Sequence, residues 1–344
     1  MADSRPLLAV TMGDPSGIGP EIVVKALADP AARATARSLV IGDAEVLDEA
    51  VRGCGLDLEV RAISSERELT DDPRHVEVLD LDNVGTLRHG VVDAASGRAA
   101  VESIERAAEL VREGRVDGIV TAPLNKEAIW ASGSGFPGHT EMLADLLGVA
   151  SDRVFTMFVL EDLRIFFLTR HHALSEVFGQ ITRERVRDGL VRVDELLREL
   201  GFEAPRLALA ALNPHAGEGG KMGTEEQTTL LPAVEDAQAK GIDVRGPIPA
   251  DAVFHQCRHG QFDAVLSLYH DQGHVAAKTL DFFGAVSCTL GLPVIRTSVD
   301  HGTAFDIAGR WVAEARGQIA ATRVAAELAP RIAAARASVP APDL

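Results

Sequence analysis

The amino-acid sequence predicts an α/β protein built on a mainly parallel sheet. Short apolar runs alternate with amphipathic helical patterns along almost the whole chain, an order that is typical of βαβ units. Aromatic residues make up only 4% of the sequence, so the core must consist of Ala, Val, Leu and Ile, which suits a buried parallel sheet covered by helices. At 344 residues the chain is too long for one simple hydrophobic core, and we expect two lobes.

Each predicted strand is a short apolar run without helical periodicity. In chain order these runs are Leu7–Met12, Ser38–Ile41, Val76–Leu79, Gly118–Ala122, Val154–Val159, Arg164–Leu168, Leu207–Leu212 and Ala264–Leu268. The segments with helical periodicity are Glu21–Leu27, Arg98–Arg112, Arg183–Leu200, Glu225–Lys240 and Gln318–Leu328. We expect Pro330 to kink or interrupt the last helix and Pro340 to stop it.

Composition marks no linker between the lobes, so their boundaries follow from glycine-rich segments. Ser132–Gly138 and Gly284–Gly291 are the candidate crossings, and two crossings make one lobe discontinuous in sequence. We therefore expect one lobe of residues 1–132 plus 285–344. The other lobe, residues 133–284, would carry most of the metal and substrate residues.

Charge and cysteine content limit the possible partners. The net charge of −17 argues against general binding to nucleic acid or anionic membranes, because both need a broad basic surface. The three cysteines, Cys54, Cys257 and Cys288, form no CxxC pair and are interpreted as reduced thiols. Residues 1–6 lack the apolar run of a signal peptide, and no apolar stretch is long enough for a membrane span. We expect a soluble, cytoplasmic protein.

A glycine-rich loop lies directly after the first predicted strand. Gly13, Gly17 and Gly19 lie within the string GDPSGIGPE, just before a predicted helix, where backbone N–H groups can face an anion. The string fits neither the GxGxxG fingerprint nor the GxxxxGK[ST] phosphate loop. A structural turn and a ligand-binding wall remain equally open.

Three histidines each follow a predicted strand and are candidate metal ligands. These are His171, His215 and His270. The carboxyl ends of neighbouring parallel strands meet at one sheet edge, and three imidazoles would leave positions open for substrate, as in catalytic zinc sites. The alternative for each is an ordinary hydrogen-bonded histidine.

Two further groups are candidates for anion binding. His139 and Thr140 open a predicted helix, where a hydroxyl, an imidazole and free amides can face a phosphate. Thr140 as a simple helix cap is the alternative. Lys278 and Arg296 flank the strand-like Val286–Leu290 and can supply charge-assisted bonds to phosphate or carboxylate, although isolated basic residues are usually just solvated.

The segment DHGTAFDIAG, residues 300–309, resembles the HGSAPDIAG loop of isopropylmalate and isocitrate dehydrogenases, which wraps the adenosine end of the dinucleotide. The resemblance implies that His301, Gly302 and Asp306 bind the cofactor. A carboxylate in this place pairs with the ribose 2′-hydroxyl and repels a 2′-phosphate, so Asp306 would favour NAD over NADP. A structural Asp that caps the next helix is the competing interpretation.

From Thr11 to Gly309 the chain is similar to 4-hydroxythreonine-4-phosphate dehydrogenases. The matching sequence motifs are TMGDPSGIGPE, TAPLNKEA, PGHTE, RHHAL, NPHAGEGG, GPIPAD, YHDQGH and LGLPVIRTSVDHGTA. This resemblance implies an isocitrate-dehydrogenase-like fold with a cleft between two lobes, and a homodimer whose active site is shared between subunits.

The resemblance also assigns roles to individual residues. The family's divalent metal, which could be zinc, magnesium or cobalt, would be held by His171, His215 and His270. His171 is preferred over its neighbour because the family's ligand lies three residues before a Leu. The family's substrate residues fall on His139, Thr140, Lys278 and Arg296.

One position departs from the family. The family usually has an Asn nine residues after the substrate lysine, and this chain has Ser287, which keeps a hydroxyl but loses the amide. A related branch oxidises 4-phospho-threonate and 4-phospho-erythronate, which carry a hydroxyl where hydroxythreonine phosphate carries an amine. We hold this branch as an alternative to 4-hydroxythreonine-4-phosphate itself.

The expected reaction is NAD-dependent oxidation of the C3 hydroxyl, followed by loss of carbon dioxide from the β-keto acid. Asp251 and Asp271, within the motifs GPIPAD and YHDQGH, are candidates for proton transfer or for support of the metal ligands. Two other classes remain open: an acyl- or phosphotransferase on the same fold, and a binding protein that has lost activity.

Overall fold

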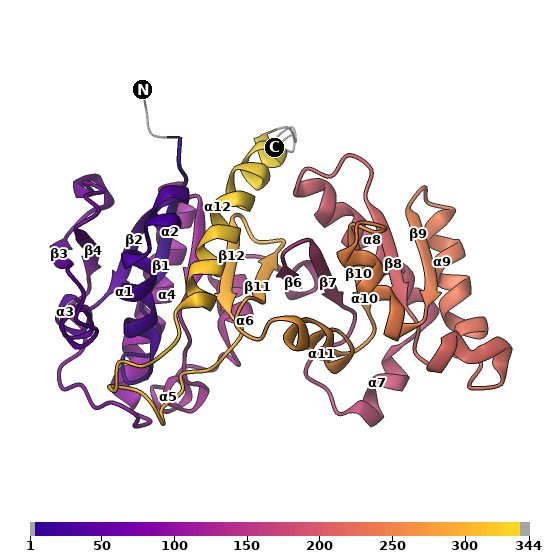
Figure 1. Cartoon of the computed structure of the whole chain (residues 1–344), viewed down its shortest axis with the longest axis horizontal. Coiled ribbons are helices and arrows are strands. Elements are labelled where there is room, and N and C mark those ends of the chain that lie inside the picture. Colours follow the sequence, from indigo (N-terminus) through magenta and orange to yellow (C-terminus); the bar gives the residue numbers. More distant parts are fainter. Residues whose placement is uncertain (1–3, 338–344) are drawn as a thin grey trace. The chain divides into compact units, whose positions relative to one another are not determined.

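The structure, a computed structural model, describes residues 4–337, and these form two α/β units (Figure 1). Unit 1 comprises residues 4–154 and 286–333, and unit 2 comprises residues 155–285 together with 334–337. One crossing, between residues 285 and 286, lies in the expected glycine-rich region. The other lies between residues 154 and 155, beyond Ser132–Gly138, because α5 (Lys126–Ala131) and α6 (His139–Leu146) pack against α4 (Ala94–Arg112) of unit 1.

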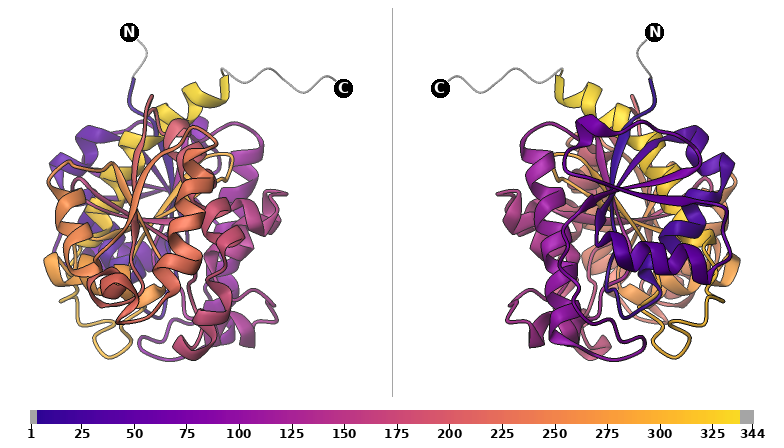
Figure 2. Two further views of the ribbon diagram at one scale, coloured as in Figure 1. Left: turned by 90° about the vertical axis from the view of Figure 1, so that its right-hand side faces the viewer. Right: turned by 90° about the vertical axis from the view of Figure 1, so that its left-hand side faces the viewer.

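Unit 1 contains a sheet with the strand order β3-β4-β2-β1-β5-β12-β11. Neighbouring strands of this sheet pair in parallel, except β11 with β12, which are antiparallel. The strands are β1 (Leu7–Thr11), β2 (Arg37–Gly42), β3 (Glu59–Ile63), β4 (His75–Asp80), β5 (Gly118–Thr121), β11 (Val286–Leu290) and β12 (Ile295–Val299). The right panel of Figure 2 shows this twisted sheet end-on, with helices on both of its sides.

Besides α4, α5 and α6, the described part of unit 1 contains four α-helices and two short 3-10 helices, Glu66–Glu68 and Ser151–Arg153. The four α-helices are α1 (Gly19–Ala28), α2 (Pro30–Thr35), α3 (Ala44–Gly53) and most of α12 (Arg316–Ala337). The α12 helix continues through Pro330, so the predicted interruption is not found, and Pro340 lies outside the described residues. Asp29, Asp43 and Asn125 cap the N-termini of α2, α3 and α5.

Unit 2 contains a smaller sheet with the order β6-β7-β10-β8-β9. The hairpin of β6 with β7 is antiparallel and the other pairs are parallel. Its strands are β6 (Phe155–Leu160), β7 (Leu163–Phe167), β8 (Arg206–Ala210), β9 (Asp243–Ile248) and β10 (Ala264–Ser267). Its helices are α7 (Leu174–Gln180), α8 (Arg183–Glu199), α9 (Leu231–Gln238), α10 (Ala250–Arg258) and α11 (His270–Leu280), with one π-helical turn at Glu226–Leu230.

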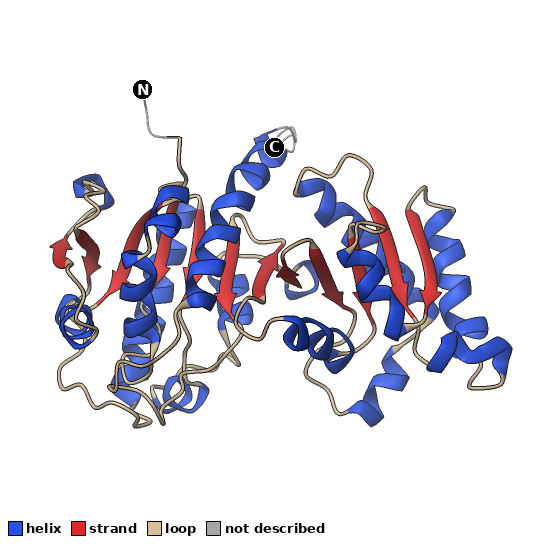
Figure 3. Ribbon diagram, in the orientation of Figure 1, coloured by secondary structure: helices blue, strands red, loops and turns tan. Residues whose placement is uncertain are grey.

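Strands and helices alternate along both units (Figure 3), which confirms the predicted α/β class. The cores are formed by the fully buried central strands, such as Leu8 and Ala9 of β1 and Val265 of β10. No helix among residues 4–337 is both long and apolar enough to span a bilayer.

The glycine-rich loop after β1 is tightly packed. All of its residues are buried, and Gly13 and Gly17 lie close to other segments of the chain. A Cβ on Gly13 would lie 2.4 Å from the Pro123 carbonyl oxygen, and a Cβ on Gly17 would lie 2.8 Å from Thr303. Glycine is therefore needed here for packing within the protein, which favours the structural turn of the two alternatives.

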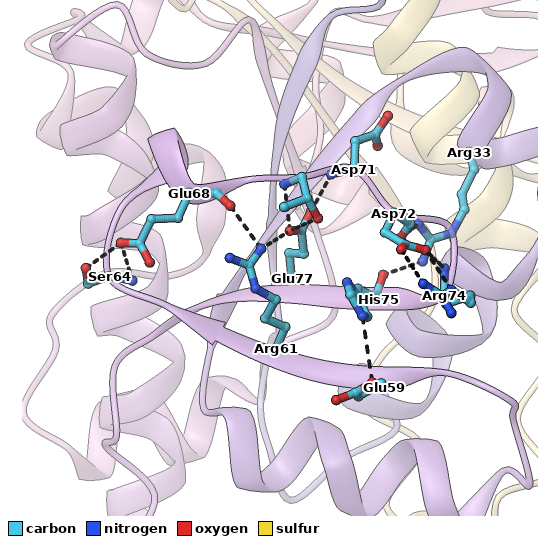
Figure 4. Close-up of polar contacts among 11 residues, drawn as sticks. Arg33, Glu59, Arg61, Ser64, Glu68, Asp71, Asp72, Arg74, His75 and Glu77 are labelled. Atoms are coloured by element: carbon cyan, nitrogen blue, oxygen red, sulfur yellow. Dashed lines mark hydrogen bonds and ion pairs between the residues drawn. The ribbon is translucent and has the colours of Figure 1, made fainter.

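A polar network holds the loop between β3 and β4 at the edge of unit 1 (Figure 4). Glu77 of β4 is buried and accepts hydrogen bonds from Arg61, from the backbone and hydroxyl of Thr70, and from the backbone of Asp71. Burial raises the pKa of Glu77, but these donors outweigh it and the pKa is lowered.

Candidate functional site

The candidate residues are distributed over both units. Unit 1 carries the substrate candidates His139, Thr140, Ser287 and Arg296 and the cofactor candidates His301, Gly302 and Asp306. Unit 2 carries the metal candidates His171, His215 and His270, the substrate candidate Lys278 and the acids Asp251 and Asp271.

Arg296 is the most unusual candidate in unit 1, because it is a cation on a central strand that is only 4% exposed. Its Nε and Nη2 donate hydrogen bonds to Thr121 Oγ1 at 3.0 and 2.6 Å, and its Nη1 donates to Thr289 Oγ1 at 3.2 Å. The sheet produces this arrangement, because β12 lies between β5 and β11 and the register places Thr289 opposite Arg296. The acceptors of these hydrogen bonds are therefore neutral hydroxyls.

The electrostatics around Arg296 favour an anion. Burial lowers the pKa of Arg296 to about 10, against the opposing effects of Cys288 and Glu141. No ion pair to Arg296 is found among residues 4–337. A guanidinium with this pKa stays charged at neutral pH, and a buried charge without a counterion is costly. A bound anion would remove that cost.

His139 lies beside this cation at the start of α6. Burial, and then the charge of Arg296, lower the pKa of His139 well below its usual value, so its ring is neutral at neutral pH. Its Nε2 has no hydrogen-bond partner among the described residues. Thr140 follows in the first turn, but Gly138 occupies the N-cap position and no side chain caps this helix. The alternative that Thr140 is a helix cap is therefore wrong.

The remaining unit 1 candidates lie on β11 and in the segment after β12. Ser287 is half-buried on β11. Asp306 and Gly302 are exposed, and His301 Nδ1 lies 3.1 Å from the Gly302 carbonyl oxygen. No helix follows Asp306 until Arg316, so the competing interpretation of Asp306 as a helix cap is wrong.

Two of the metal candidates meet in unit 2. His171 follows β7 and His270 opens α11 directly after β10. Because β7 and β10 are adjacent parallel strands, their carboxyl ends bring the two imidazoles together, with ring centroids 5.5 Å apart. His270 Nδ1 lies 2.6 Å from Asp271 Oδ1, which leaves Nε2 of His270 for a ligand.

Both imidazoles line a pocket of about 260 Å³. Its lining residues are Arg170, His171, His172, Leu174, Val177, Tyr269, His270 and Asp271. Two lining residues were not predicted from the sequence: Tyr269, and Arg170, whose Nη1 donates to Thr156 Oγ1 at 2.8 Å. Their positions within the motifs RHHAL and YHDQGH were the available signal.

His215 lies elsewhere, on a left-handed turn after β8. His215, Ala216, Gly217, Glu218 and Gly219 all have positive φ, between 43° and 78°. The His215 side chain is 66% exposed, and its Nδ1 lies 3.3 Å from Glu218 Oε2. Among residues 4–337, no three side chains of His, Cys, Asp or Glu in one chain lie close enough together to hold a metal ion. The structure thus brings together two of the three predicted ligands.

The other unit 2 candidates lie on the helices α10 and α11. Asp251 lies in the first turn of α10 and is exposed. Lys278, in the last turn of α11, has its Nζ 5.1 Å from the centre of the Phe282 ring. Neither side chain lines the histidine pocket.

Comparison with known proteins gives the family. The family model for the pyridoxal phosphate biosynthetic protein PdxA matches residues 34–325. The chain belongs to the PdxA family.

Two curated relatives bear the provisional name D-threonate 4-phosphate dehydrogenase. The protein of Cutibacterium acnes is 48% identical over 330 residues, or 94% of either chain. That of Symbiobacterium thermophilum is 49% identical over 329 residues, or 95% of this chain and 98% of its own.

Solved structures of the family share the fold. The 4-hydroxythreonine-4-phosphate dehydrogenase of Klebsiella pneumoniae is 40% identical with a TM-score of 0.88, covering 96% of this chain and 99% of its own. The enzyme of that name from Burkholderia phymatum is 42% identical with a TM-score of 0.83, covering 95% and 99%. The expected family and fold are confirmed, and the chain is a dehydrogenase of this family. The acyl- or phosphotransferase and the inactive binding protein are left without support.

Proposed function

We propose that this dehydrogenase uses NAD and a divalent metal ion to oxidise the C3 hydroxyl of a small hydroxy acid that is phosphorylated at C4. A hydride passes to NAD, a proton is released, and the β-keto acid then loses carbon dioxide. The observation that carries the proposal is the buried Arg296, a cation held by neutral hydroxyls beside the neutral His139. Such a site is suited to the anionic end of a substrate.

D-threonate 4-phosphate is the substrate that we favour. Relatives named for it are 48% and 49% identical to this chain, and Ser287 stands where the family usually has an Asn. A hydroxyl there can donate to or accept from the C2 hydroxyl of a threonate. The second candidate is 4-hydroxythreonine-4-phosphate, because the solved enzyme with that name has a TM-score of 0.88 to this chain.

The histidine pocket of unit 2 fits part of a metal site. Imidazole nitrogens are ligands that suit zinc and cobalt better than magnesium, and Asp271 orients His270 so that Nε2 is available. A bound divalent ion would lower the pKa of the substrate hydroxyl and stabilise the charge that develops on decarboxylation. His171 and His270 would hold this ion.

We further propose that the third ligand, His215, comes from a second copy of the chain. This follows from the family resemblance, which implies a homodimer with a shared site. It is supported by exposed apolar side chains on the helices next to the pocket, namely Leu174 and Phe178 of α7 and Val275 of α11, which are 56%, 56% and 62% exposed. Exposed apolar groups of this size are typical of surfaces that another chain covers.

The cofactor proposal concerns the segment after β12. Asp306 is an exposed carboxylate that can accept hydrogen bonds from ribose hydroxyls and would repel a 2′-phosphate. His301 and Gly302 would lie along the same cofactor. We therefore expect NAD to be preferred over NADP.

The proposal is tested by measuring NADH formation with both phosphorylated substrates, with NAD or NADP, and with added zinc, cobalt or magnesium. We expect the highest kcat/KM with D-threonate 4-phosphate and NAD. Arg296→Lys keeps the charge but loses the planar fork, and should raise KM for the substrate on the order of tenfold with little change in KM for NAD. Absence of NADH with every substrate and metal combination would refute the proposed reaction, and a strong preference for the amine substrate would select the second candidate.

A further inference from the structure

Thr121, the last residue of β5, uses its whole hydrogen-bonding capacity. Its side chain is fully buried. Oγ1 accepts from Nε and Nη2 of Arg296 at 3.0 and 2.6 Å and donates to the Thr297 carbonyl oxygen at 3.5 Å. A hydroxyl has one donor and two acceptor sites, so its orientation is fixed by these three contacts.

The contacts leave two N–H groups of the Arg296 guanidinium for a ligand. A guanidinium has five N–H groups. Thr121 accepts from Nε and from one N–H of Nη2, and Thr289 accepts from one N–H of Nη1. One N–H therefore remains on each terminal nitrogen, and these two charged donors are the ones left for a carboxylate or phosphate.

The neutral character of Thr121 matters as much as its position. A carboxylate in its place would orient the guanidinium equally well, but it would neutralise the charge and compete with a bound anion. A hydroxyl fixes the plane of the guanidinium and leaves its positive charge available. The β5 strand adds rigidity, because it pairs with β12 in parallel, and Ser298 Oγ donates to the Thr121 carbonyl oxygen at 3.2 Å.

We propose that Thr121 is a positioning residue, which holds the Arg296 guanidinium so that its two remaining N–H groups receive the anionic group of the substrate. The proposal gives a role to Thr121 as the first residue of the TAPLNKEA motif. The proposal rests on the proposed function of Arg296, and it predicts that loss of the Thr121 hydroxyl affects anion binding more than turnover or cofactor binding.

The test compares Thr121→Val, which removes the hydroxyl at nearly constant volume, with Thr121→Ser, which keeps it. Competitive inhibition by inorganic phosphate, KM for the phosphorylated substrate, KM for NAD and kcat are measured for both full-length variants, with Arg296→Ala for reference. We expect Thr121→Val to raise KM for the substrate and the inhibition constant of phosphate, both on the order of tenfold. Thr121→Ser should stay close to the unmodified protein, and KM for NAD should not change.

The outcomes separate the two proposals. If Arg296→Ala leaves phosphate inhibition and substrate KM unchanged, then Arg296 is not the anion site, and both proposals fail. If Arg296→Ala weakens phosphate inhibition but Thr121→Val does not, only the positioning role is overturned. Because Thr121→Val could also destabilise unit 1, its thermal midpoint is measured in parallel. An equal rise in KM for NAD and for substrate, without rescue by Ser, shows a purely structural role and overturns the proposal.

Discussion

Removing the carboxylate of Glu226 is predicted to loosen the turn that carries His215. Glu226 is 3% exposed. Its Oε1 accepts from the backbone N–H groups of Leu212 and Asn213 at 2.9 and 2.7 Å, and its Oε2 accepts from Asn213 Nδ2 at 2.9 Å. These bonds hold the chain just before the turn.

The size of the effect follows from the backbone of that turn. Three of its left-handed residues, His215, Ala216 and Glu218, are not glycine, and each costs roughly 1–2 kcal/mol in this conformation. Three hydrogen bonds to a buried charge contribute roughly 1.5–3 kcal/mol each. Loss of all three therefore removes a contribution comparable to, or larger than, the strain of the turn. The ordered turn should become a minor conformation in Glu226→Ala, and metal affinity should fall by about tenfold or more.

Amide hydrogen exchange and calorimetric zinc titration measure this effect. In Glu226→Ala we expect faster exchange at the Leu212 and Asn213 amides and weaker zinc binding. Glu225→Ala is the matched control, because Glu225 is exposed and its carboxylate accepts a hydrogen bond, at 2.8 Å, from Asn213 Nδ2 but none from the backbone of Leu212 or Asn213. If Glu226→Ala exchanges as slowly as Glu225→Ala and binds zinc equally well, the turn does not depend on Glu226.

Three further predictions concern unit 1. Glu77→Gln should lower the free energy of unfolding by about 2 kcal/mol at neutral pH. Because hydrogen bonds such as those from Thr70 lower the folded pKa of Glu77, this contribution exists above the unfolded pKa and is lost as the pH falls through the folded pKa, so the stabilities measured by urea titration should converge as the carboxyl group becomes protonated in the folded state. Asp14→Asn should have the opposite sign, since burial raises the pKa of Asp14 from 3.8 to about 6. Its ionisation costs stability that is lost as the pH rises from the unfolded pKa to the folded one, so the variant should be more stable at pH 8 by up to about 3 kcal/mol and gain nothing in urea at low pH. Gly17→Ala should cost about 1–3 kcal/mol, because its Cβ would meet Thr303 at 2.8 Å, and thermal unfolding together with KM for NAD will show whether the cofactor segment shifts.

Most of the buried central strands could be predicted from the sequence. The strands β3, β9 and β12 were not predicted, and each omission has a physical reason. The edge strands β3 and β9 are partly exposed, so each contains polar residues and lacks a continuous apolar run. In addition, β9 contains Gly246 and Pro247, which are typical of loops. The strand β12 is fully buried but reads IRTSV. Its polar side chains are satisfied by hydrogen bonds to neighbouring strands and helices, a condition that no local pattern reveals.

In the candidate site, too, the features with a local sequence pattern could be predicted and those that depend on tertiary contacts could not. His171 and His270 could be paired from sequence because they follow strands of a parallel sheet, and the observed neighbours β7 and β10 bring them together. His215 also follows a strand, but five consecutive left-handed residues determine where it lies, and this conformation has no clear sequence signal. Thr121 could not be linked to Arg296, because their contact depends on the pairing of β5 with β12, which are far apart in the chain.

We propose that His171 and His270 of one copy and His215 of another hold one metal ion, and purified heterodimers provide the decisive experiment. His171→Ala and His215→Ala are co-expressed with different affinity tags, and the mixed dimer is isolated with both tags. Each parent homodimer should be inactive and bind no stoichiometric zinc. In the mixed dimer one of the two sites regains all three imidazoles, so about half of the unmodified activity and one zinc per dimer are expected. A mixed dimer as inactive and metal-free as its parents would contradict the claim.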